Sequence, residues 1–146
     1  MSRSEDDDKL DRIAKYKIFK RAFDTVSFFV ESGNIVGGFV LSFSILEDRM
    51  KAAMVDCFKA IGEPIGSNEI SKIPYGKVVS RLKRVKAIDE SLGQRLMDAA
   101  DLRNTLTHQM MWRLDVFKVE HIEQFLQLIT DLKRAHRAFV RLNKSR

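Results

Sequence analysis

The chain has 146 residues, of which 45% are hydrophobic and 32% are charged, and its formal net charge is +6. This length and composition predict one globular domain with a real hydrophobic core and exclude a disordered chain. The basic balance is compatible with a polyanionic partner, but net charge also serves solubility and does not select a function.

The cysteine content and the lack of long apolar runs limit the setting of the protein. Cys57 is the single cysteine, which rules out an intramolecular disulfide and argues against a cysteine-based zinc site. No segment approaches the roughly 20 apolar residues that a membrane span needs. Residues 1–8 are acidic and polar, unlike a secretory signal. We therefore expect a cytoplasmic protein in a reducing setting, with no membrane association.

The beginning of the chain predicts a flexible lead-in followed by a long helix. We expect residues 1–8 to form a flexible acidic tail and residues 9–146 to form a single domain. From residue 9 to about residue 30, apolar residues recur at steps of three and four, which is typical of an amphipathic helix. These residues are Ile13, Tyr16, Phe19, Phe23, Val26 and Val30.

The second predicted helix, over residues 35–61, has the clearest apolar pattern in the chain. Its apolar residues alternate by three and four over about six turns, which indicates a helix that packs on neighbours along its whole length. They are Val36, Phe39, Phe43, Leu46, Met50, Ala53 and Cys57. Because Cys57 falls on this stripe, we expect a core thiol and not a nucleophile. Residues 62–74 contain both prolines and predict a loop.

The third predicted helix, over residues 75–87, carries a basic face. Between residues 72 and 86 there are six basic residues and no acidic ones. Candidates for RNA contact on this helix are Lys77, Arg81, Lys83 and Arg84. The pattern fits a solvated surface as well as a surface that contacts phosphates.

Two further helices complete the predicted fold. Asp89 is a suitable N-cap for a fourth helix, and after a break near residues 113–117 a long last helix begins. We find no strand alternation and no internal repeat. The sequence therefore predicts an all-α fold, an up-and-down bundle of four to five helices.

Residues 101–108 of the fourth helix combine an arginine, an asparagine and a histidine. At 100° per residue, Arg103 falls inside the apolar stripe of this helix, where an unpaired charge would be costly to bury. The stripe consists of Leu92, Leu96, Ala99, Leu106 and Met110. Glu47 or Asp48 could pair with this guanidinium. Asn104 and His108 share a different face of the helix, and Asp101 lies near them.

The other two histidines lack neighbours at the spacing of metal ligands. His121 and His136 are therefore expected to be structural or surface residues, and we predict no metal site.

The motif Arg-Asn-x-x-x-His, late in an all-helical chain of this size, resembles the signature of the HEPN superfamily. In this chain its residues are Arg103, Asn104 and His108. The segment from Phe43 to Arg49 is also similar to the aromatic-x-x-Leu-Glu segment common in early HEPN helices. The resemblance covers roughly residues 35–140 and implies a HEPN-like domain.

The resemblance implies a metal-independent endoribonuclease of the toxin or antiviral type, which acts on RNA as a homodimer and needs no cofactor. An imidazole such as that of His108 suits proton transfer from a ribose 2′-OH, and the guanidinium of Arg103 suits a phosphoryl group that gains charge. Asn104 would position these groups. In the family, the motifs of two protomers face each other across a cleft, so Arg103 of one chain could act beside His108 of the other.

Two other functions are compatible with the same residues. Some HEPN-like proteins bind without cutting, among them transcriptional repressors of the mannitol-operon type and partners of nucleotidyltransferases or antitoxins. A plain helical dimerisation domain would leave Arg103 without a purpose. Because the chain has both Arg103 and His108, the nuclease is the favoured prediction.

Overall fold

The computed structural model describes residues 5–110 and 112–144, and the elements in these ranges are all helices. They are α1 (Glu5–Glu31), α2 (Ile35–Ala60), α3 (Ser67–Ile70), α4 (Tyr75–Arg84), α5 (Glu90–Gln109) and α6 (Val119–Lys144). The prediction of an all-α helical bundle is therefore confirmed for the described residues. None of the helices in the described ranges has an apolar stretch of the length needed to cross a membrane.

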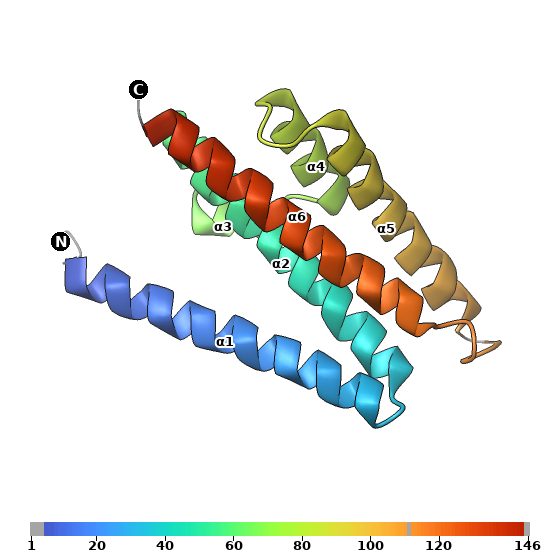
Figure 1. The fold of residues 1–146 in the computed structure, drawn as a ribbon. Helices are drawn as coiled ribbons and strands as arrows, with labels where there is room; N and C mark the ends of the chain where they lie inside the picture. The colour runs from blue at the N-terminus through green and yellow to red at the C-terminus, as the bar shows by residue number, and fades with distance from the viewer. Residues whose placement is uncertain (1–4, 111, 145–146) are drawn as a thin grey trace.

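Helices α2 and α6 lie side by side and form the centre of the bundle (Figure 1). Helix α2 begins where the Asn34 side chain accepts a hydrogen bond from the Gly37 backbone N–H at 2.9 Å. One turn later, Gly38 allows α6 to approach closely. A Cβ atom at this position would lie 2.9 Å from Cδ1 of Ile122, so a larger residue here would have to displace that side chain.

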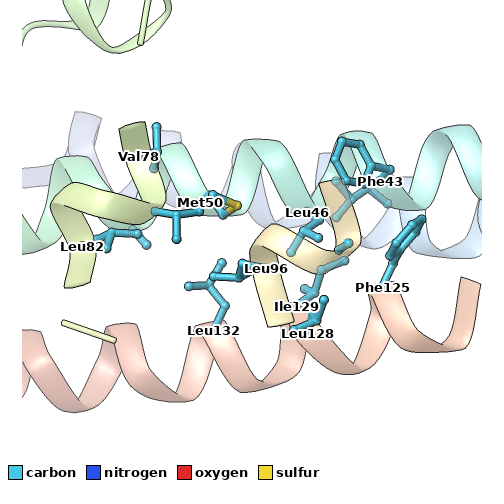
Figure 2. Close-up of a cluster of buried hydrophobic side chains, with 14 of the residues drawn as sticks. Phe43, Leu46, Met50, Val78, Leu82, Leu96, Phe125, Leu128, Ile129 and Leu132 are labelled. Carbon is cyan, nitrogen blue, oxygen red and sulfur yellow. The ribbon is translucent and has the colours of Figure 1, made fainter. Parts of the chain in front are cut away.

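The hydrophobic core lies where α2 and α6 meet α4 and α5 (Figure 2). Its fully buried members include Leu46 and Met50 from α2, Leu96 from α5, and Phe125 from α6. Cys57 is also fully buried, and burial raises the pKa of its thiol to about 12. The thiol is therefore protonated at neutral pH, as expected for a core residue.

The predicted count of four to five helices is one too low for the described residues. The additional helix is α3, a single turn of four residues inside the predicted loop 62–74, which is too short to show an apolar period. Helix α4 ends at Arg84 and not at residue 87, because Lys86 adopts a left-handed φ of 64° that cannot continue a helix. At the start of the chain, residues 5–8 already belong to α1, whereas residues 1–4 lie outside the described ranges.

Helix α1 packs on the bundle through its second half and diverges from it toward the amino terminus (Figure 1). Val26 is buried, and Phe19 and Phe23 are half-buried against the core. Ile13 and Tyr16 belong to the predicted stripe, yet their exposed fractions are 43% and 68%. The apolar stripe of α1 therefore extends to residues near the amino terminus that the rest of the bundle leaves exposed.

Candidate functional site

Helix α5 carries the predicted motif, and Arg103 lies on the side of this helix that faces α2. The Asp89 side chain caps the start of the helix by accepting a hydrogen bond from the Leu92 backbone N–H at 2.7 Å. The buried residues of α5 follow the predicted stripe, and Met110 packs partly buried at its end. They are Leu92, Gly93, Leu96, Ala99 and Leu106. Arg103 projects between Ala99 and Leu106, where this pattern otherwise places apolar side chains.

The guanidinium of Arg103 is held by three neighbours. Its Nη2 lies 3.5 Å from Oε1 of Glu47, and its Nη1 donates a hydrogen bond to Oδ1 of Asn104 at 3.1 Å. The carbon Cζ lies 4.9 Å from the centre of the Phe43 ring, within the range of a cation–π contact. With 41% of its side chain exposed, Arg103 remains accessible to a ligand from solvent.

Helix α2 presents Phe43 and Glu47 to Arg103 together, because residues four apart lie on one face of a helix. Both residues belong to the segment from Phe43 to Arg49, in which the sequence offered Glu47 as a partner for Arg103. The Arg103–Glu47 pair is partly exposed, so solvent screens it and it contributes at most about 1 kcal/mol to stability. Its main effect is to orient the guanidinium. Of the two candidate acids, Glu47 is the one that reaches Arg103.

Tyr75, at the start of α4, is a part of the site that the sequence did not indicate. Its O–H donates a hydrogen bond of 2.6 Å to the backbone carbonyl of Leu96 on α5, and its ring stacks on Phe43 at 5.5 Å. Burial raises the pKa of Tyr75 above its usual range; the Glu47 carboxylate adds to this effect and Arg103 opposes it. Tyr75 thus remains a neutral donor that ties α4 and α2 to α5 beneath Arg103. No local sequence pattern reveals a contact between residues 21 positions apart.

Replacing Tyr75 by phenylalanine should lower the free energy of unfolding by about 1 kcal/mol, the usual contribution of one buried hydrogen bond. The ring stack on Phe43 should persist, so the far-UV circular dichroism should not change. Urea unfolding of the parent and of the variant measures the difference. An unchanged midpoint would show that the hydrogen bond to Leu96 contributes nothing to the attachment of α4.

His108 lies exposed near the end of α5, beside a shallow groove. Asn104, Thr105, His108 and Gln109 line this groove. His108 lies five positions after Arg103, which places the two residues about 140° apart around the helix axis. The two side chains therefore do not meet within one chain. Asn104 lies between them, because it contacts the guanidinium and also lines the groove of the histidine.

The other two histidines have structural contacts, as the sequence predicted. Nδ1 of His121 accepts a hydrogen bond from the Lys118 backbone N–H at 3.1 Å at the start of α6, and His136 lies 2.9 Å from Asp56. Among the described residues, no group of three or more His, Cys, Asp or Glu side chains could hold a metal ion. His108 is therefore the histidine that has no hydrogen bond or ion pair to another described residue.

The remaining candidates do not gather at the motif. Asp48 and Asp101 are exposed and make no hydrogen bond or ion pair with any residue that the structure describes. On α4, Lys77 and Arg84 are exposed and Arg81 is half-exposed. Lys83 pairs with Glu90 at 3.1 Å, at the opposite end of α5 from the motif.

The distance along α5 shows how far this end of α4 is from the histidine. The stem of Lys83 runs across Gly93, so close that a Cβ atom at that glycine would lie 2.5 Å from Cδ of the lysine. From Gly93 to His108 there are 15 residues of helix, which corresponds to about 22 Å along the axis. Lys83 and Arg84 could therefore contact only a more distant part of a nucleic acid bound at the motif.

Comparison of the chain with protein-family models, with curated proteins and with solved structures finds no match.

Proposed function

We propose that this protein is a metal-independent endoribonuclease of the HEPN type, with Arg103, Asn104 and His108 as its reactive residues. The observation that carries the proposal is the position of Arg103. Its guanidinium lies on the core side of α5 and is oriented by Glu47 and Asn104, and 41% of the Arg103 side chain remains exposed. A cation fixed in this way can bind a phosphoryl group without rearrangement.

The reaction requires a base and a stabiliser of charge. The His108 imidazole takes the proton from a ribose 2′-OH, and the 2′-oxygen attacks the adjacent phosphorus. The bond from phosphorus to the 5′-oxygen breaks, and this oxygen takes a proton from solvent. The products are a 2′,3′-cyclic phosphate and a 5′-hydroxyl end. Arg103 neutralises the additional negative charge on the phosphoryl oxygens in the transition state.

Because Arg103 and His108 diverge by about 140° on one helix, we propose that a homodimer completes the site. Two α5 helices that face each other would bring the guanidinium of one protomer to the imidazole of its partner. Asn104 would then contribute from the seam between them. Trp112 and Leu114, in the segment that follows α5, are exposed apolar residues close in sequence to His108.

The test uses purified protein, a chelator and RNA. We expect the protein to cleave total RNA in the presence of EDTA and to leave ends that carry a 2′,3′-cyclic phosphate. These ends should resist ligation until an enzyme that removes 2′,3′-cyclic phosphates has acted on them. An oligonucleotide with 2′-deoxyribose at the cleaved position should remain intact, because its attacking oxygen is missing. Cleavage of that oligonucleotide would contradict this mechanism.

A matched control separates the proposed chemistry from contaminating nuclease. The variant His136→Ala removes a histidine far from the motif and should retain the activity of the parent protein. If the parent binds RNA but leaves it intact, the protein is a non-catalytic binding module of the same family type, and the proposed reaction is wrong.

A further inference from the structure

We infer that a basic groove on α6 binds the phosphate backbone of the RNA at a distance from the point of cleavage. For the identity of the ligand, the inference rests on the proposed function. Residues 132–144 contain five basic residues and no acidic one. Four of these cations line one groove together with Thr130 and Ala138, and they are Lys133, Arg134, Arg137 and Arg141. A stripe of cations along one helix is the electrostatic pattern of a nucleic-acid surface.

The positive charge of this groove is not neutralised by the part of the chain that the structure describes. Within that part, Lys133, Arg137 and Arg141 form no ion pair. The basic face of α4 differs in this respect, because Lys83 pairs there with Glu90 at 3.1 Å. The groove on α6 is therefore the better site of attraction for a polyanion.

Two cations at this groove are held by packing against α1. Nζ of Lys133 lies 5.2 Å from the centre of the Phe23 ring, and Cζ of Arg49, on α2, lies 4.8 Å from that of Phe19. Nε of Arg49 is buried without a hydrogen-bond partner among the described residues. Burial, and then the charge of Arg137, lower the pKa of Arg49, and burial followed by Arg49 and Arg137 lowers that of Lys133. A bound anion would offset this crowding of like charges.

The helix dipole does not account for the whole row of cations. Basic residues complement the dipole within the last turn of a helix, and α6 ends at Lys144. Lys133 and Arg137 lie two to three turns before that end. From Lys133 to Arg141 the row extends about 12 Å along the axis. A single phosphate would meet only a part of this row, whereas a strand with a phosphate at every nucleotide can contact several of its cations at once.

The groove lies away from the proposed reactive residues. In Figure 1, α1 and α5 lie on opposite sides of the central helices α2 and α6. The groove adjoins α1 through Lys133, whereas Arg103 belongs to α5. Phe125 marks the level of Arg103 on α6, because both contact Phe43. Arg137 follows twelve residues later, about 18 Å further along the axis. An RNA that contacts both surfaces must therefore extend well beyond the cleaved phosphate.

The first test measures RNA binding by full-length His108→Ala, which should leave the RNA intact. A labelled oligouridine of about 30 nucleotides is titrated at salt concentrations between about 50 and 200 mM. Adding Arg137→Ala and Arg141→Ala should raise the dissociation constant about tenfold or more. The slope of log K against log salt should fall in magnitude by about 1.4, because two contacts to the phosphates of a single strand are lost. Both arginines are exposed, so circular dichroism and the melting temperature should not change.

A matched control is Lys77→Ala with Arg84→Ala, which removes the same charge from exposed positions on α4. This pair should leave the slope unaltered. An equal fall of the slope in both double variants would reflect net charge alone and would overturn the inference. An unchanged slope in the α6 variant, or no binding of RNA by His108→Ala, would also overturn it. If polyglutamate of equal charge displaces the RNA as well as unlabelled oligouridine does, the groove belongs to an acidic protein segment and the choice of RNA is wrong.

The second test measures cleavage by the chain with His108 intact. Because the groove contacts RNA away from the cleaved phosphate, Arg137→Ala with Arg141→Ala should raise KM about tenfold and leave kcat unchanged. A fall in kcat at unchanged KM would place these arginines in the reaction and overturn the inference. If the parent cleaves no RNA but the α6 variant lowers the binding slope, the groove is supported and the proposed reaction is wrong. Cleavage by the parent together with an unchanged binding slope would have the opposite meaning.

Discussion

Replacing His108 by alanine is expected to lower the rate constant of RNA cleavage about 10²- to 10⁴-fold, the usual contribution of a general base. Arg103→Ala should lower it about 10²- to 10³-fold, because one donor to the charged transition state is lost. Because His108 is exposed, the free energy of unfolding of His108→Ala should differ from that of the parent protein by less than about 0.5 kcal/mol. Single-turnover cleavage of one defined RNA measures the rate constants.

Two conservative variants test why the arginine is needed. Arg103→Lys keeps the positive charge but loses the planar fork that contacts Glu47 and Asn104, so it should recover only a part of the rate. Glu47→Gln should affect the rate constant less than Arg103→Ala, because the cation itself remains. If Arg103→Lys were as active as the parent, a fixed guanidinium would not be the source of the rate.

Mixing two inactive variants tests whether the site is shared between protomers. In a mixture of Arg103→Ala and His108→Ala, each heterodimer would contain one site with both groups. About a quarter of the activity of the parent should return when subunits exchange at random. The variant with both substitutions in one chain, mixed with either single variant, should remain inactive. If mixing the two single variants restores no activity, each site is formed within one chain.

The parts of the fold that local patterns determine could be predicted from the sequence. The stripe from Phe39 to Cys57 predicts α2, and Asp89 predicts the start of α5. The contact between Arg103 and Glu47 was predictable from a similar local pattern. Arg103 interrupts an apolar stripe, and this conflict alone demands a partner, which the structure provides as Glu47.

The features that could not be predicted depend on contacts between distant segments. Tyr75 contacts Leu96 across 21 positions, and nothing around the tyrosine marks this contact. The spacing of apolar residues likewise predicts that one face of α1 is apolar, but it does not show whether other parts of the same chain bury that face. This is why Tyr16 was placed in a stripe that the structure leaves exposed. The single turn α3 is too short for an apolar residue to recur at the helical period.

Replacing Phe125 by alanine is expected to lower the free energy of unfolding by about 3–5 kcal/mol. Phe125 is fully buried on α6, and its ring packs against Phe39 at 5.1 Å and against Phe43 at 5.3 Å, both on α2. Its removal would leave a cavity between the two central helices, which rigid neighbours fill only in part. Domains of this size are stable by about 5–15 kcal/mol, so this single change could remove much of the total. Urea unfolding followed by circular dichroism measures the loss.

Two comparisons separate the cavity from other causes. Phe125→Leu fills most of the space and should lose less than about 1.5 kcal/mol, whereas Leu114→Ala, at a residue 65% exposed, should change stability by less than about 0.5 kcal/mol. Because Phe43 contacts both Phe125 and Arg103, the cavity should also loosen the support of the guanidinium. We therefore expect Phe125→Ala, where it remains folded, to cleave RNA more slowly than Phe125→Leu. An alanine variant as stable as the leucine variant would mean that α2 and α6 collapse onto the cavity, and the expected loosening of Phe43 beside Arg103 would then be wrong.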